Sequence, residues 1–279
     1  MIANLFQAEV GWSWYPSIVI GFSAWTLLYI WAHRGRQTPF FQQFAFHFGT
    51  VIGLLALISP LDELGDEYLF SVHMVQHLLL MFVTAPMWLI GTPSWLIDNI
   101  VPDRFDKVVI RLTNPIITFF VFVGVLYIWH IPAIYDLALA SEAIHIFEHI
   151  CFIGAALIGW WPVIGSSSVK IPKPAPPLRI LYLFLLALPC TALAAILTFA
   201  PKPLYPFYEL APHIFGMSAL QDQQLGGLLM WLPTHLILLL VLGITFIKWF
   251  TEADRIGQQN KFKTENLDGY GTDLQKLGV

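Results

Sequence analysis

Histidines spaced four residues apart occur twice in this 279-residue chain, within the segments SVHMVQHLLLM and IHIFEHI. The first pair is His73 and His77, and the second pair is His145 and His149. Side chains at positions i and i+4 lie on one face of an α-helix, so each pair can direct two imidazoles at one point. Imidazole suits copper, zinc and iron as a ligand. The spacing therefore predicts a transition-metal site.

Residues of other ligand types flank these pairs. Met81 continues the stripe of His73 and His77 by a further four residues, and Glu148 adjoins His149, where its carboxylate could bind a metal or fix a histidine tautomer. Copper has the highest affinity in the divalent series, and methionine sulfur favours its reduced form, so copper is the predicted ion. Further possible ligands, or residues that orient ligands, are His130, Asp222 and His235.

Each of these residues also has a purely structural interpretation. A single histidine inside a membrane often forms a hydrogen bond to a neighbouring helix, Met81 could simply pack, and Asp222 could cap its own helix. Two pairs in one leaflet are harder to explain in this way, because ionisable groups there are costly and usually functional. The paired histidines are therefore the predicted ligands.

The composition places these histidines in a membrane protein. Hydrophobic residues make up 57% of the chain and charged residues 11%, against about 25% charged residues in soluble domains. The net charge of −4 excludes a basic nucleic-acid-binding protein. Cys151 and Cys190 form no CxxC motif, which excludes a disulfide scaffold, a zinc ribbon and a thioredoxin-like site.

Seven apolar segments are candidates for membrane-spanning helices, each of which needs about 20 residues. The predicted fold is therefore an all-α polytopic bundle of seven transmembrane helices in residues 1–250, followed by a polar cytoplasmic tail, residues 251–279, with a composition compatible with disorder. The seven segments run near Pro16–Trp31, Phe44–Ile58, Leu69–Ile90, Pro115–Trp129, Ala143–Trp161, Leu178–Ala200 and Gln223–Trp249.

The basic residues predict the orientation. If the N-terminus is outside and the C-terminus is cytoplasmic, every lysine and arginine except Lys202 falls on the inner side, as the positive-inside rule requires. The outer segments then hold ten acidic residues, including the acidic segment Asp62–Glu67, which could collect cations or contact a partner. The same imbalance also follows from the positive-inside rule alone.

Several motifs, in order along residues Trp12 to Phe250, resemble the CtaG family of cytochrome c oxidase assembly factors, of the caa-type oxidase class. They are SPLDELGDEYLFSVHMVQHLLLM, GTPSWL, HIPAIYD, HIFEHICF with the following WWPV, and DQQLGGLLMW. The resemblance implies a bacterial plasma-membrane protein with seven spans that is needed for assembly of a heme-copper oxidase. It implies oxidase subunits as partners, copper delivery or insertion as the task, and no enzymatic activity.

Combining the residues with the resemblance gives one hypothesis and two alternatives. In the hypothesis, His73, His77, His145 and His149 hold one copper ion near the outer surface, from which an oxidase subunit takes it by ligand exchange. The first alternative is a membrane redox subunit that binds haem between opposed histidines. The second is a metal-cation transporter, which would need polar groups at the midplane, where the sequence offers His235 with Thr198 or Thr234.

Overall fold

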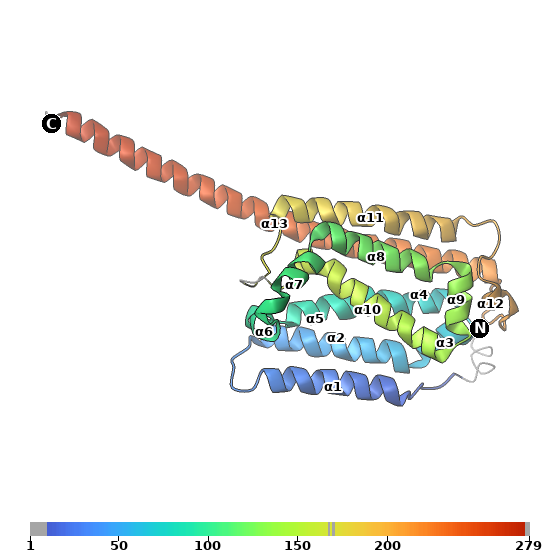
Figure 1. The fold of residues 1–279 in the computed structure, drawn as a ribbon. Coiled ribbons are helices and arrows are strands. Elements are labelled where there is room, and N and C mark those ends of the chain that lie inside the picture. The colour runs from blue at the N-terminus through green and yellow to red at the C-terminus, as the bar shows by residue number, and fades with distance from the viewer. Residues whose placement is uncertain (1–9, 167, 169–170, 277–279) are drawn as a thin grey trace.

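The computed structural model describes residues 10–166, 168 and 171–276, with side chains up to residue 259. Within these residues it contains helices and no strands. Long helices lie side by side as a bundle, and the last one projects far beyond it (Figure 1). The helices are α1 Pro16–Ala32, α2 Phe40–Ile58, α3 Pro60–Glu67, α4 Phe70–Leu79, η2 Leu80–Thr84, α5 Ala85–Gly91, α6 Ser94–Ile100, η3 Asp103–Phe105, α7 Asp106–Leu112, α8 Pro115–Trp129, α9 Pro132–Leu139, α10 Glu142–Ile164, α11 Pro176–Thr198, α12 Pro206–Leu210 and α13 Ala219–Lys276.

The all-helical architecture is confirmed, and each predicted apolar segment coincides with a helix over most of its length. Five helices are long and apolar enough to cross a membrane. They are α2, the continuous helix Phe70–Gly91 formed by α4, η2 and α5, α10, α11, and the part of α13 up to Gln259. Helix α8 passes the same criterion only together with Asp103–Leu112, to which it is bent by 64°. Helix α1 is shorter, with 17 residues.

The helix Phe70–Gly91 changes its winding in the middle. Residues Leu80–Thr84 form a π-helical turn, in which the backbone N–H of Ala85 donates to the carbonyl of Leu80, five residues earlier. Pro86 follows directly, and proline lacks the backbone donor that would continue a regular α-helix. Such turns are frequent at functional sites. Here the turn starts three residues after His77.

Short helices close one end of the bundle. Helices α3, α9 and α12 lie at that end, opposite to the end from which α13 projects (Figure 1). Ser59 alone separates α2 from α3, and its hydroxyl accepts a hydrogen bond from the Leu61 N–H at 3.4 Å. The acidic segment Asp62–Glu67, expected as a connector, is therefore helical and rests against the start of α4.

Helix α13 corrects the expectation for the C-terminal segment. Its helical backbone continues from the apolar part through to Lys276, so residues 251–276 form a helix rather than an irregular tail. Extending a helix that already exists needs no new nucleus, this stretch contains no proline, and Arg255 pairs with Glu252 at 2.8 Å. Residues 277–279 lie outside the described part of the chain.

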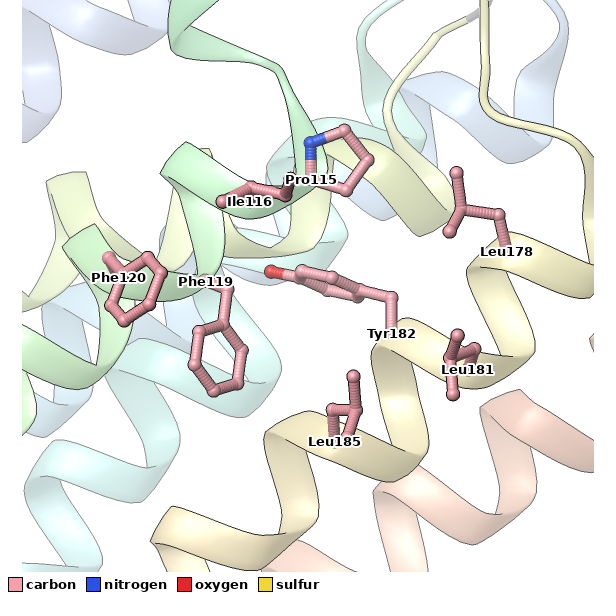
Figure 2. Close-up of a pocket in the computed structure, with 8 residues that line it drawn as sticks. All are labelled: Pro115, Ile116, Phe119, Phe120, Leu178, Leu181, Tyr182 and Leu185. Carbon is pink, nitrogen blue, oxygen red and sulfur yellow. The ribbon is translucent and has the colours of Figure 1, made fainter.

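An apolar groove of about 350 Å³ lies between α8 and α11 (Figure 2). Phe119, Phe120 and Leu185 are among its lining residues, and Tyr182 supplies a hydroxyl. That hydroxyl donates to the Gly159 carbonyl at 2.6 Å. The groove therefore offers no free polar group for binding or catalysis, and its lining suits contact with lipid chains.

Candidate metal centre

The two predicted histidine pairs face each other between α4 and α10. The ring centroids are 4.3 Å apart both between His73 and His77 and between His145 and His149. Across the two helices, His77 lies 5.3 Å from His149, and His73 lies 5.4 Å from His145. The four imidazoles therefore form one compact group, called the histidine cluster below.

Three of these histidines form the inner set, consisting of His73, His77 and His149. One ring nitrogen from each lies within 4.8 Å of those of the other two. His73, His77 and His149 are 0%, 4% and 6% exposed, respectively. Metal–imidazole bonds measure about 2.0–2.1 Å, so two ligands of one ion lie up to about 4 Å apart. Small side-chain movements would bring all three nitrogens to one ion.

Asp66 on α3 completes a second group, the outer set, together with His73 and His145. Its two carboxylate oxygens lie 3.1 Å from His73 Nδ1 and 3.3 Å from His145 Nδ1. A carboxylate accepts hydrogen bonds, so each Nδ1 carries the hydrogen and each Nε2 keeps a lone pair. The Nε2 atoms of His73 and His145 have no hydrogen-bond partner among the described residues. Without an ion, Asp66 therefore favours the tautomer with a free Nε2 in both rings, whereas an ion held by the outer set itself would replace the two Nδ1 hydrogens that point at Asp66.

Glu148 adds a buried carboxyl group to the cluster. The residue is 1% exposed, and its Oε1 atom lacks a hydrogen-bond partner within the described part of the chain. This oxygen lies 4.0 Å from His77 Nε2, and both ring nitrogens of His77 are also without partners there. Unpaired buried polar groups are expensive, and a bound cation would give these nitrogens and the Glu148 carboxylate a partner. The donor set thus fits a transition-metal ion.

Close packing of α3 on α4 holds Asp66 in place. A Cβ atom at Gly65 would lie 2.9 Å from the Cα of His73, so only glycine permits this approach. The Gly65 carbonyl accepts a hydrogen bond of 2.6 Å from the hydroxyl of Tyr208 on α12. The ring of Tyr135 on α9 lies 5.4 Å from the His73 ring. The outer set therefore depends on contacts from three separate helices.

The acidic residues of α3 have unusual proton affinities. Burial raises the pKa of Asp62 to about 7, and the charge of Asp66 adds to that rise. Burial also raises the pKa of Asp66 to about 6, while His145 opposes the rise. Asp62 accepts a hydrogen bond of 2.7 Å from the Gln76 side chain. These carboxyls therefore change charge close to neutral pH.

Two of the other predicted residues lie near the cluster but outside both sets. The His130 Nδ1 donates to the Leu126 carbonyl at 2.7 Å, and its Nε2 has no partner among the described residues. The ring of Phe152 lies 6.2 Å from the His130 ring and 4.4 Å from the His77 ring, so it packs near both. Met81, in η2, is buried in the hydrophobic core.

The two remaining predicted residues are held by other partners. Asp222 accepts a hydrogen bond of 3.2 Å from the backbone N–H of Ser71, so it caps the start of α4 rather than facing the histidines. His235 Nδ1 donates to the Trp231 carbonyl at 2.7 Å, and its Nε2 lies 2.6 Å from the Thr191 hydroxyl. The structure therefore brings neither residue into a ligand set.

Asp66 is the residue that the sequence-based prediction did not single out. The sequence placed it only within the acidic segment Asp62–Glu67. Its spacing from His73 carries no helical signal, because α3 ends at Glu67 and α4 begins at Phe70. The available signal was the proximity in sequence of a carboxylate run to a histidine pair.

Residues 24–252 match the family described as cytochrome c oxidase caa3 assembly factor (Caa3_CtaG). The chain belongs to this family. The resemblance seen in the sequence motifs is thereby confirmed, and the family is one of assembly factors rather than a class of catalytic enzymes. No solved structure matches the chain.

Curated relatives come from mycobacteria. Proteins described as uncharacterized, from Mycobacterium bovis and Mycobacterium tuberculosis, are each 25% identical over 270 residues, which cover 88% of this chain and 40% of the relative. A similarly described protein from Mycobacterium leprae is 23% identical over 233 residues, covering 75% and 35%. The chain thus spans less than half the length of these relatives. Bacterial relatives and apolar helices together support a multi-pass bacterial membrane protein.

Proposed function

We propose that this family member binds one copper ion at the histidine cluster and supports its insertion into a heme-copper oxidase. The observation that carries the proposal is the inner set. Its three histidines are buried, their ligand nitrogens lie within 4.8 Å of one another, and the free nitrogens have no protein partner among the described residues. Membership in a family of oxidase assembly factors supports a role for such a site in delivering metal to the oxidase.

The choice of copper follows from the donor types. Imidazole nitrogens with a nearby carboxylate suit copper, zinc or iron better than calcium or magnesium, and copper has the highest affinity in the divalent order. A site for delivery must also release its ion. Three inner histidines with Glu148 beside them leave the coordination incomplete, as at metal sites that keep a position open for an incoming ligand.

The proposed topology places the cluster at the outer face of the bacterial plasma membrane. Seven spans with the N-terminus outside put α3, α9 and α12 outside and the projecting end of α13 in the cytoplasm. Helix α1, with 17 residues, is about 26 Å long at 1.5 Å per residue, close to the hydrocarbon thickness of about 30 Å. Reporter fusions after α3 and after α13 would test the topology, because opposite locations are expected.

The geometry favours copper over the two alternatives. Haem takes its axial imidazoles from opposite faces of a flat ring, whereas these imidazoles crowd together with centroid distances from 4.3 Å upward. A transporter would need free polar groups at the midplane, but the deeper His235 is hydrogen-bonded at both ring nitrogens. The haem alternative therefore lacks opposed ligands, and the transporter alternative would depend on Thr198, whose hydroxyl has no partner among the described residues, rather than on His235.

Metal analysis of the detergent-purified full chain tests the proposal. Near-stoichiometric copper is expected in the wild type, with loss of that copper when His73, His77, His145 and His149 are replaced together by alanine. The absorption spectrum of the same sample should lack a Soret band. In cells, the quadruple variant should fail to produce active oxidase. Full oxidase assembly by that variant, at normal expression, would contradict the proposal.

A further inference from the structure

Two neighbouring cavities, which share lining residues, lie at the α3 end of the bundle, next to the histidine cluster. The wider cavity, of about 440 Å³, is lined by polar residues that include Glu63 and Tyr68. The narrower cavity, of about 180 Å³, reaches His145 and His149. Asp62, Asp66 and Glu67 line both cavities. Together these spaces form what is called the acidic vestibule below.

The carboxylates of the vestibule come from two helices. Asp62, Glu63, Asp66 and Glu67 lie on α3, and Glu142 opens α10. No lysine or arginine is among the described residues that line either cavity. Clefts lined by a single sign of charge concentrate counter-ions and raise their association rates. The vestibule is therefore suited to attract cations.

A second, independent observation connects the vestibule to a ligand. His149 lines the narrower cavity, is 6% exposed, and has no hydrogen-bond partner for its Nε2 atom among the described residues. Exposure also falls along the path inward. The side chains of Asp66 and His145 are 19% and 13% exposed, whereas that of His77 is 5% exposed and that of His73 fully buried.

We propose that the acidic vestibule is the uptake route for the cation and that the outer set is its first binding position. From Asp66, His73 and His145, the ion passes to the inner set by exchanging Asp66 and His145 for His77 and His149. His73 belongs to both sets, so the ion stays beside the same imidazole while the other ligands exchange. In the outer set the ion takes the place of the Nδ1 hydrogens that otherwise point at Asp66. This inference rests on the proposed function, since it assumes that the histidine cluster binds a metal.

Stepwise exchange avoids an unfavourable intermediate. A bare cation moving through a buried space would lose its water without gaining ligands, at a large cost. Each ligand lost here can be replaced by one nearby, because the His73 and His149 rings are 6.2 Å apart and the His145 and His149 rings 4.3 Å apart. The outer set therefore serves as a step between solvent and the buried site.

Stopped-flow mixing of the purified full chain with Cu²⁺ tests the route, with intrinsic fluorescence quenching as the signal. In the double variant Glu67→Gln and Glu142→Gln, the association rate should fall by about 10-fold or more at low ionic strength. The difference should shrink at high salt, and the saturating stoichiometry should stay at one. Glu209→Gln is the matched control, because Glu209 is exposed and lines neither cavity.

His145→Ala separates the outer set from the inner set. It should slow copper uptake while leaving one copper bound at equilibrium on the inner set. An unchanged rate in His145→Ala, or in the double carboxylate variant, would overturn the proposal. Equal slowing by Glu209→Gln would also overturn it, because surface charge in general would then explain the effect.

A labelling experiment avoids dependence on the folding of these variants. Glu67→Cys, modified with a cationic thiol reagent after folding, should block copper uptake in proportion to labelling. Glu209→Cys, labelled to the same extent, should leave copper uptake unchanged. If labelling blocks uptake at both positions, or at neither, the proposed route is contradicted. If the wild type binds no copper, or the quadruple histidine variant still binds it, the proposed function itself fails. If that variant loses copper but vestibule changes leave the rate unaltered, the uptake route alone fails.

Discussion

Two helix pairs of the bundle that contain histidines differ in how the rings are hydrogen-bonded. Between α4 and α10, five ring nitrogens of the histidine cluster and one oxygen of Glu148 have no hydrogen-bond partner among the described residues. Between α11 and α13, His235 is paired at both nitrogens, with Trp231 and Thr191. The residue type is the same in both regions, and the second region needs no ion to satisfy it.

The difference shows which observation separates a ligand from a structural residue. Burial alone does not, because Asp222, which is hydrogen-bonded to Ser71, and Glu148, which lies at the cluster, are similarly inaccessible at 3% and 1% exposed. The hydrogen-bond partners do, since buried polar groups are normally satisfied and an unsatisfied cluster requires another explanation. A cation between α4 and α10 provides that explanation for the histidines and for Glu148 together.

Single histidine variants test most directly whether the two regions differ in copper binding. His77→Ala removes one inner ligand and should lower copper affinity by more than about 100-fold, beyond the effect of losing an orienting group. His235→Ala should leave the affinity within about 2-fold and instead lower thermal stability. Competition with a copper chelator measures the first quantity and a melting curve the second. Equal losses of copper in the two variants would remove the distinction between the regions.

Glu148 provides the next largest expected effect. Glu148→Gln keeps the size of the side chain but removes the carboxyl group that can become a carboxylate beside a cation at His77, and copper affinity should fall by about 10- to 100-fold. The matched control is Asp222→Asn, which alters the cap of α4 at Ser71. That variant should lose about 1 kcal/mol of stability and keep its copper affinity. A greater copper loss in Asp222→Asn would show that helix position, rather than local charge, governs the site.

Gly65 tests whether close packing positions the outer set. Gly65→Ala places a methyl group 2.9 Å from the His73 backbone, which should cost about 1–3 kcal/mol. Copper affinity should fall with it, because α3 carries Asp66. Gly124→Ala on α8 meets no atom within 4 Å and should be neutral or slightly stabilising. Melting curves and copper titrations of the two variants in parallel measure these effects.

Asp62 provides the smallest expected effect, and it depends on pH. Its pKa is raised to about 7 in the folded protein from an ordinary value of 3.8, so the folded state binds more protons between these values. Stability contributed by this group therefore falls as pH rises from about 4 to 7. Asp62→Asn should raise the apparent Tm by a few °C at pH 8, and by less than half as much at pH 5. A pH-independent difference would contradict the raised pKa.

Much of the site could be predicted from the sequence because its key contacts are local. The i,i+4 spacing of His73 with His77 and of His145 with His149 fixes which side chains share a helix face, whatever the rest of the fold does. Long apolar segments likewise predict helices in a membrane, since every backbone polar group must be satisfied there. Asp222 and His235 could not be judged in this way, because their partners Ser71 and Thr191 are distant in sequence.

The sequence by itself determined the all-helical membrane architecture, the family and the two histidine pairs, because hydropathy and helical periodicity act over short stretches of chain. Only the tertiary structure decided that the pairs meet, that Asp66 bridges His73 and His145, and that His235 is satisfied elsewhere. It also decided that the acidic segment folds over the cluster as α3. These outcomes depend on contacts between helices, and no spacing within one helix encodes them.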